Sequence, residues 1–509
     1  MRIFLTISIW LLWLNCCKAQ QFSVLYDHNS FANDGSTIIK TTTGYICTHS
    51  AIDIESLRFS TFISNHNNLS SLLTDLSLGD QNNIFSLSEP NFGIVYNSDL
   101  ELYYVFGNHQ VDDSDFNKPF ILRLNESSEI IDTVYITALN EHNLHTQGGC
   151  IASDYLYLLG QLNNSTQTFL IKCDLDGNYL SHTISSIGFI SDPKFIVNEG
   201  DGFLIGGTYF PVDHPNAVQW QYIRKFSYDG QLLWTNIIEN FESTALPSMG
   251  AVNAMPMDNG NILFAGTATS GQLLQECFRP MIGEIDNLSG DTLWTKKYFS
   301  PDSIHIMHNF KRLSTGEYIG VGETRQPLNF PVNMFITTAF IFKLDSEYNL
   351  LWKRIYTPSG FAGGPLAEPT CHLNDFVENE DGGITALGRA FTYTGTGPQS
   401  GYIQDSWLLR VDSDGCLVSG CAVDITEYEA TNDLFVYPNP ATDRLNIEFP
   451  HIDKWHVSIY NMQGALVKEE QPHQLLHYSI GVQELPSGVY SLLCHDSQGK
   501  TFSHKIIKH

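Results

Sequence analysis

No local catalytic motif gathers the reactive residues of this 509-residue chain. The sequence has no His-Glu-x-x-His zinc motif, no Gly-x-Ser-x-Gly nucleophile turn, no Gly-x-x-x-x-Gly-Lys phosphate loop and no Cys-x-x-Cys pair. A catalytic site must therefore come from residues that lie far apart in the sequence and converge in the fold. Glu323 and Asp375 are the candidate carboxylates, and a separation of about 5 to 9 Å would suit glycosidic chemistry.

Two acidic segments resemble the start of a calcium loop. They read Asp174-Leu-Asp176-Gly177 and Asp412-Ser-Asp414-Gly415, but neither has the later ligands or the distal Glu of such a loop. Both fall where a hairpin turn is expected. We interpret them as turns and predict no cofactor, with calcium as the alternative.

Histidine and cysteine give few further signals. His305 and His308 are a close mid-chain pair without a neighbouring carboxylate, which favours surface or hydrogen-bonded core histidines over metal ligands. Cys416 and Cys421 directly follow a turn, and a disulfide could close the small loop between them. We expect the other mature cysteines to be buried thiols.

Composition and the N-terminus indicate an exported protein. The net charge of −28 would repel nucleic acid and anionic lipid over most of the surface. Residues 1–19 read as a signal peptide, with Arg2, an apolar run from Ile3 to Leu14 and a cut after Ala19. A lipid anchor at Cys16 or Cys17 is the alternative. No later segment is long and apolar enough to predict a transmembrane helix.

A unit of short strands recurs along residues 20–423. Each unit has a short strand, a Gly-containing turn, an apolar strand ending in Gly, a loop, an alternating strand, a second turn and a strand that often carries Leu-Trp. Clear copies begin near Gly202, Gly260, Gly316 and Gly382, and weaker copies begin near Gly44, Leu100 and Tyr155. Seven such units predict an all-β, seven-bladed β-propeller, with two unrelated β-sandwiches as the alternative. The segment Phe22–Tyr26 resembles a fourth strand and could complete the last blade.

The long connections should all lie on one face of this propeller. Turns between the first and second strands, and between the third and fourth, are short, whereas the other connections are long and varied. Antiparallel pairing places the two sets at opposite ends, so we expect a binding face at the long-loop end. The residues that follow the second-strand glycines are candidates for its rim: His109, Gln161, Tyr209, Thr267, Glu323, Arg325 and Arg389.

The last part of the chain changes character after an acidic linker at residues 424–433. Short alternating strands and turns over residues 434–509 predict a small Ig-like β-sandwich. Three ordered motifs resemble those of the type A C-terminal sorting domain of the Bacteroidota type IX secretion system. They comprise Pro438, Asn439 and Pro440, then Ile459, Tyr460, Asn461 and Gly464, then Leu485, Gly488 and Tyr490, with Lys505 in the terminal Lys-rich strand.

This resemblance implies where the protein goes and what handles it. The translocon of the outer membrane would recognise the domain, and a sortase-like protease would remove it as the cargo is released or attached to the cell surface. The sequence then leaves three functions open, in order of preference. They are a non-catalytic module that binds a glycan or protein, a hydrolase or lyase, and a structural surface component.

Overall fold

The computed structural model describes most of the chain and divides it into two compact units, Met1–Ile425 and Thr426–His509. The described residues are 21–26, 32–52, 59–68, 70–78, 83–87, 93–111, 117–138, 143–162, 167–186, 190–210, 220–238, 249–270, 277–299, 304–327, 335–358, 370–394, 401–417, 435–437, 441–461, 465–497 and 501–508. The predicted signal peptide and linker lie outside them. Every regular element in these ranges is a β-strand, and none of them forms a helix that could cross a membrane.

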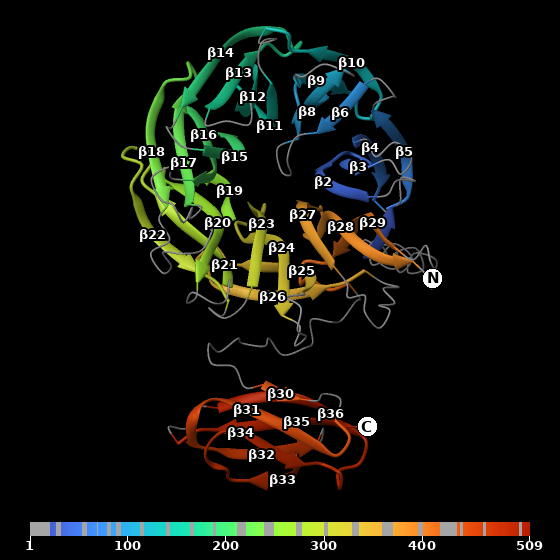
Figure 1. Cartoon of the computed structure of the whole chain (residues 1–509), viewed down its shortest axis with the longest axis vertical. Coiled ribbons are helices and arrows are strands. Elements are labelled where there is room, and N and C mark those ends of the chain that lie inside the picture. Colours follow the sequence, from blue (N-terminus) through green and yellow to red (C-terminus); the bar gives the residue numbers. More distant parts are fainter. Residues whose placement is uncertain are drawn as a thin grey trace, which may run out of the picture. The chain divides into compact units, whose positions relative to one another are not determined.

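The first unit is built from antiparallel groups of strands placed around a common centre (Figure 1). The first group contains β2 (Ala32–Lys40), β3 (Gly44–Ile52), β4 (Phe59–Asn67) and β5 (Leu72–Leu78). In the second group, β6 (Asn83–Leu87) and β7 (Ile94–Asn97) both pair with β8 (Leu102–Val111), followed by β9 (Lys118–Leu124) and β10 (Ile130–Tyr135).

The same pattern continues along the chain. The next group contains β11 (Leu144–Ala152), β12 (Tyr155–Leu162), β13 (Gln167–Cys173) and β14 (Tyr179–Ser186). It is followed by β15 (Ile190–Asn198), β16 (Gly202–Phe210), β17 (Trp220–Ser227) and β18 (Leu232–Ile238). Then come β19 (Met249–Pro256), β20 (Ile262–Ser270), β21 (Cys277–Ile285) and β22 (Thr292–Lys297).

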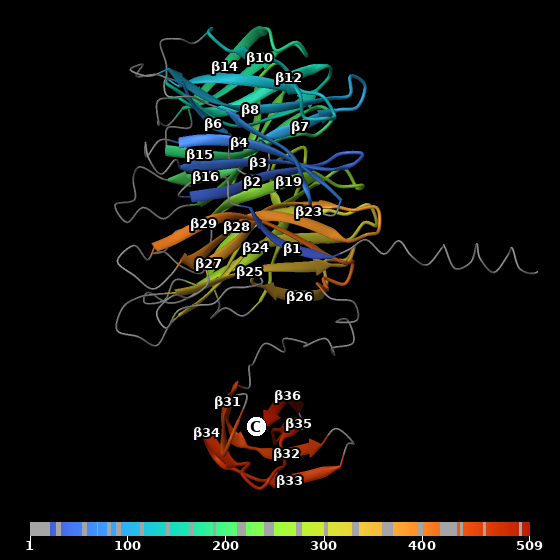
Figure 2. The ribbon, with the colours of Figure 1, turned by 90° about the vertical axis from the view of Figure 1, so that its right-hand side faces the viewer.

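Two further groups complete the first unit. One contains β23 (Ile304–Arg312), β24 (Tyr318–Pro327), β25 (Phe335–Leu344) and β26 (Leu350–Tyr356). The last contains β27 (Thr370–Glu378), β28 (Ile384–Thr394), β29 (Gly401–Val411) and, from the other end of the chain, β1 (Phe22–Tyr26). The strands β2, β11, β15, β19, β23 and β27 lie toward the centre, and β5, β10, β14, β18, β22 and β26 lie at the circumference (Figure 1). Figure 2 shows the strands from the side, running across the thickness of the unit.

The N-terminal strand joins the last group to the first. β1 pairs antiparallel with β29 in the register Val24 to Leu408, and the indole nitrogen of Trp407 donates to Ser23 Oγ at 2.9 Å. Directly after β1, β2 makes a parallel bridge to β29. The sequence prediction that this segment acts as a fourth strand is confirmed by the pairing.

Inner strands carry a bulge at one recurring place. One extra residue interrupts the register in β2, β11, β15, β23 and β27, at Ser36, Gln147, Lys194, His308 and Asn374 respectively. The second strand places a glycine opposite several of these bulges. A Cβ atom at Gly388 would lie 1.9 Å from the carbonyl oxygen of His372. The glycine that ends the second strand in the sequence repeat is therefore required by the close approach of the bulged strand.

A second recurring contact links neighbouring inner strands. The residue after the bulge turns its side chain toward the next group: Asn253 Nδ2 donates to the carbonyl of Phe310 at 2.9 Å, and Asn309 Nδ2 donates to Asp375 Oδ1 at 2.6 Å. Asp375 Oδ2 in turn accepts from the backbone N–H of Ile38 at 3.0 Å. These bonds tie β19 to β23, β23 to β27, and β27 to β2.

In two of the turns between the third and fourth strands, an aspartate side chain accepts hydrogen bonds from the backbone. Asp174 Oδ1 accepts from the N–H groups of Asp176 and Asn178, and Asp412 Oδ1 accepts from those of Asp414 and Cys416. These carboxylates close the turns that the sequence predicted at both segments, and the calcium alternative stays a prediction.

The cysteines are mostly single buried thiols, as predicted. Cys47, Cys150, Cys173, Cys371 and Cys494 are buried and not in disulfides. Cys416 is disulfide-bonded. Cys421 lies outside the described residues, so its pairing with Cys416 stays a prediction.

The C-terminal unit packs two sheets on one core. One sheet has the order β30 (Phe435–Tyr437), β31 (Arg444–Lys454), β34 (His473–Gly481), and the other β33 (Leu466–Glu470), β32 (His456–Asn461), β35 (Gly488–His495), β36 (Thr501–Lys508). Side chains from both sheets meet in the core, where Trp455 stacks on Phe449 with ring centroids 4.5 Å apart.

Turn glycines offer a test of how neighbouring groups pack. Gly290 has a φ of +78°, and a Cβ there would lie 2.7 Å from the ring of Trp234 in the preceding group. We expect Gly290→Ala to lower the free energy of unfolding by about 2 to 4 kcal/mol, from backbone strain plus the clash. Gly260 has a similar φ of +85°, but a methyl group added there would meet no atom within 4 Å, so Gly260→Ala should cost only about 1 to 2 kcal/mol.

Urea unfolding of both variants measures this difference. Equal losses would show that the turn glycine is needed only for its backbone conformation, which would contradict the packing argument.

Candidate functional site

Charged and polar side chains gather where three neighbouring groups meet near the centre of the first unit. We call this set the inner polar cluster. It comes from β2, β23, β24, β27 and β28 and contains Asp34, His308, Glu323, Arg325, His372, Asn374 and Arg389. These residues lie toward the ends of the strands from which the long connections leave, which is the end predicted to bind.

Glu323 forms the deeper part of the cluster. Its Oε1 accepts from Arg325, with Nε at 2.7 Å and Nη2 at 2.5 Å, and its Oε2 lies 3.4 Å from His372 Nδ1. Glu323 and Arg325 are two residues apart on β24, so their side chains leave the same face of the strand. Glu323 is thus held between a cation on its own strand and an imidazole on β27.

Asp34 holds the other side of His372. Asp34 Oδ2 accepts from Arg389 Nη1 at 2.7 Å, and Oδ1 accepts from Asn374 Nδ2 at 3.0 Å. His372 Nε2 lies 4.0 Å from the same Oδ1. The imidazole of His372 therefore stands between two carboxylates, each of which is paired with an arginine.

Bulged residues complete the cluster. His308 Nδ1 lies 3.0 Å from Asn374 Oδ1, and Asn374 Nδ2 also donates to the carbonyl of Gly35 at 2.8 Å. Both His308 and Asn374 are the extra residues of their strands. Bulges re-aim side chains and are common beside functional sites.

Burial and charge act in opposite directions on the titrating groups. Burial raises the pKa of Glu323, but the hydrogen bond from His372 and the charges of the two histidines and Arg325 outweigh it, so its pKa lies below the ordinary value. Burial lowers the pKa of His308 to about 4, and the neighbouring His372 adds to the effect. Glu323 is therefore a carboxylate at neutral pH, and His308 is neutral.

Exposure differs within the cluster in a way that suits binding. The side chains of Glu323 and His372 are each 6% exposed, whereas those of Arg325 and Arg389 are 35% and 33% exposed. Asp34 is 26% exposed. The buried side chains of Glu323 and His372 thus hold the partly exposed arginines and Asp34 in fixed positions.

The predicted rim residues fall into two sets. Glu323, Arg325 and Arg389 meet in the inner polar cluster. The others are elsewhere: His109 is buried against the ring of Tyr135, Gln161 lies half-buried on β12, and only the backbone of Tyr209 is described. Thr267 is fully buried, and its hydroxyl accepts from the N–H of Met307 at 3.0 Å. Its position is internal because it joins β20 to the next inner strand.

Asp375 has a structural position rather than the catalytic one suggested by the sequence. It is fully buried and accepts from Lys311 Nζ at 2.5 Å and from Asn309, as well as from two backbone N–H groups. Both carboxylate oxygens are therefore hydrogen-bonded inside the protein, away from solvent. His305, the other half of the His305 and His308 pair, is buried against the aromatic rings of Phe299 and Phe340.

Sequence reasoning missed Asp34, His372 and Asn374 in this cluster. These residues lie at or beside the bulges of the inner strands, and the bulges are visible only in the strand pairing, so the sequence carried no signal for them. It also missed a group of three potential metal ligands among the described residues. The ligand atoms of Cys47, His49 and His66 all lie within 4.8 Å of one another.

The predicted sorting residues have identifiable places in the C-terminal unit. Ile459 is fully buried, Leu485 and Tyr490 are buried, and Gly488 and Lys505 are exposed. Asn461 Oδ1 accepts from the N–H of Ala465 at 2.9 Å, and the Tyr490 hydroxyl donates to the carbonyl of Pro486 at 2.7 Å, so both side chains secure turns. Tyr460 lies half-buried on β32. Pro438, Asn439, Pro440 and Gly464 lie outside the described residues.

Comparison with protein families identifies this unit. Residues 435–509 match the family described as the secretion system C-terminal sorting domain. The chain is therefore a cargo protein of the type IX secretion system, and its sorting domain implies export to the cell surface or the medium. No curated protein sequence matches the chain.

Solved structures resemble the chain only distantly. The phage phi92 endosialidase is 9% identical, with a TM-score of 0.44 over 96% of this chain and 87% of that one. The polysaccharide lyase Uly1 is 11% identical, with a TM-score of 0.42 over 79% and 93%. The WD40 domain of SCAP from fission yeast is 10% identical, with a TM-score of 0.35 over 72% and 82%. Likenesses at this level say nothing about the activity of this chain.

The pKa of His308 gives a testable pH dependence. Its ordinary value is 6.5, so between about pH 6.5 and 4 the unfolded chain binds a proton that the folded chain does not. The free energy of unfolding should therefore fall as the pH falls through this window. We expect His308→Gln to reduce the loss between pH 7 and pH 4.5 by about 1 to 3 kcal/mol.

Urea unfolding of the wild type and the variant at the two pH values measures the effect. The same loss in both proteins would show that His308 takes up its proton in the folded chain, and the assigned environment would be wrong.

Proposed function

We propose that the chain is an exported seven-bladed β-propeller that binds a glycan at the inner polar cluster. Residues 20–423 would form the propeller, residues 424–433 the linker and residues 434–509 an Ig-like sorting domain. The strand groups and the pairing of β1 with β29 support this organisation. Its partners would be the type IX translocon, a sortase-like protease and an extracellular glycan.

The observation that carries the binding proposal is the fixed geometry of the two arginine-carboxylate pairs. Arg325 with Glu323, and Arg389 with Asp34, each present donors and acceptors side by side, held by His372 and Asn374 beneath them. Sugar hydroxyls both donate and accept, so preorganised pairs of this kind suit them. Because the chain carries a net charge of −28, a neutral glycan is a better ligand than a polyanion.

An enzyme with two carboxylates in acid and base roles is less well supported. A glycosidase of that type needs one protonated carboxyl group at its working pH. Glu323 has a lowered pKa, and Asp375 is enclosed by its own hydrogen bonds. The observation that favours an enzyme is His372, which lies between two carboxylates and could move a proton in a hydrolase or lyase. A structural surface component would need neither feature.

Glycan binding by the purified full chain tests the proposal. We expect the wild type to bind one or more neutral glycans on an array, and Arg325→Ala and Arg389→Ala each to weaken that binding at least about 10-fold. Arg312 is a matched control, because its guanidinium pairs with Asp258 at the opposite end of β23. Arg312→Ala should change the affinity less than about 2-fold.

Two results would contradict this proposal. If Arg325→Ala and Arg389→Ala bind the glycan as tightly as the wild type and Arg312→Ala do, the ligand binds elsewhere. Cleavage of a bound glycan that is lost in His372→Ala would establish the hydrolase or lyase in place of the non-catalytic binder.

A further inference from the structure

A buried set of metal-ligating side chains lies in the first strand group, apart from the inner polar cluster. Cys47 and His49 stand two residues apart on β3, so their side chains leave the same face of the sheet. His66 lies on the adjacent strand β4, where it pairs with Tyr45. The thiol and both imidazoles are at most 1% exposed.

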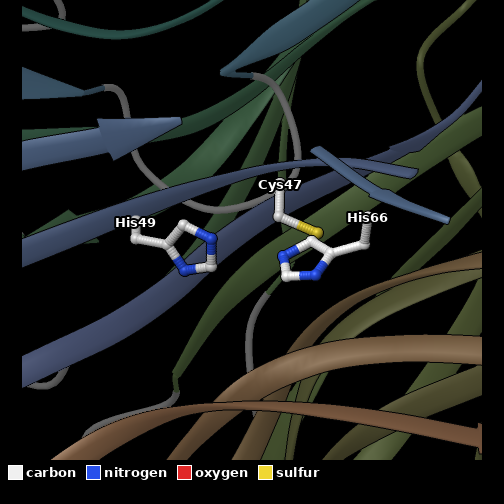
Figure 3. Close-up of side chains that lie close together, drawn as sticks. All are labelled: Cys47, His49 and His66. Atoms are coloured by element: carbon white, nitrogen blue, oxygen red, sulfur yellow. The ribbon is translucent and has the colours of Figure 1, made fainter. Parts of the chain in front are cut away.

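These three side chains point toward one another. Their ligand atoms all lie within 4.8 Å, and Figure 3 shows the sulfur of Cys47 beside the ring of His66, with the two imidazole rings extending toward each other. Ideal tetrahedral zinc geometry would place such atoms about 3.4 to 3.6 Å apart. Side-chain adjustments of about 1 Å would therefore bring them to a common ion.

Neighbouring residues already hold the rings in a suitable orientation. His49 Nδ1 lies 2.9 Å from Ser406 Oγ on β29, which leaves Nε2 directed into the set. Ser64 Oγ lies 2.6 Å from His49 Nε2 and 2.7 Å from His66 Nε2. The bond from Ser406 to Nδ1 is the kind of second hydrogen bond that fixes the tautomer of a metal-binding histidine. The Ser64 hydroxyl bridges the two Nε2 atoms, so a bound ion would replace these two hydrogen bonds, and water could supply its fourth ligand.

The three side chains lie where the first strand group contacts the last one. Cys47 packs with Leu387 and Leu408 of the last group, and the ring of His66 lies 4.4 Å from that of Tyr26 on β1. His49 pairs with Gly35 on β2. Several other groups have a glycine at the second-strand position that corresponds to His49, and that glycine has no room for a side chain. The first group thus departs from the repeat at the contact between the first and last groups.

We propose that Cys47, His49 and His66 bind a zinc ion that stabilises this contact. A thiolate with two imidazoles is a ligand set that zinc takes in proteins. Burial and the charge of Asp375 keep the metal-free thiol protonated by raising its pKa, so zinc must displace one proton from Cys47. The bound ion and thiolate together carry one positive charge, which the same Asp375 carboxylate would then attract.

Metal binding by the purified full chain tests this proposal. The chain is first stripped of metal with a chelator and then incubated with zinc. After excess zinc is removed, we expect elemental analysis to find one equivalent of zinc per chain. Cobalt should give a thiolate-to-cobalt charge-transfer band. Cys47→Ser should abolish the band and weaken zinc binding at least about 10-fold, whereas Cys173→Ser removes a buried thiol on β13 and should leave both unchanged.

His66→Gln, checked for folding by circular dichroism, tests the site independently if Cys47→Ser does not fold. It should keep a cobalt-thiolate band of lower intensity and lose at least about 10-fold in zinc affinity. A wild-type chain that takes up no zinc or cobalt would overturn the proposal, as would uptake that is equal in Cys47→Ser. Neither result depends on glycan binding.

Discussion

The rest of the first unit depends on one buried carboxylate, Asp375. It is fully buried and joins three inner strands, because Asn309 and Lys311 donate from β23 and the N–H of Ile38 donates from β2. A buried charge is tolerated only when such partners surround it, and removing one partner of a buried ion pair costs about 3 to 5 kcal/mol. The requirement fixes the positions of β23, β27 and β2 relative to one another. Asn253 extends the same type of link from β19 to β23 with a neutral side chain, by donating to the carbonyl of Phe310.

The candidate site is a consequence of that constraint. Asn374 and Asp375 are successive residues at a bulge, and Asn374 bonds His308 and Asp34 in the inner polar cluster while Asp375 bonds the neighbouring strands. The polar cluster and the buried network therefore share a strand segment. A ligand that contacts Arg325 and Arg389 would touch side chains already held by hydrogen bonds, which reduces the entropy lost on binding.

The sequence predicted that residues 22–26 form a fourth strand, and the pairing of β1 with β29 agrees, because period-two patterns and turn glycines are local signals. It expected Glu323, Arg325 and Arg389 on a binding rim without indicating that they share contacts. It could not predict that His372 and Asp34 join Glu323, since they come from separate groups whose contact depends on bulges. It also placed Thr267 on the rim, but that hydroxyl is fully buried against the next inner strand. Cys47, His49 and His66 were missed because His66 reaches the other two across a strand pair, and Cys47 and His49 alone match no metal motif.

In the proposed propeller, the N-terminal strand closes the ring by pairing with β29, which brings the first and last strand groups together beside both proposed sites. A cross-link measures this directly. Val24 faces Leu408 in the pairing, and opposed strand residues lie close enough for a disulfide. After mild oxidation of the full chain, Val24→Cys with Leu408→Cys should cross-link and migrate faster on a non-reducing gel. The pair Val24→Cys with Leu409→Cys should not, because those side chains leave opposite faces. Absence of the first cross-link, or equal formation of both, would contradict the closed ring.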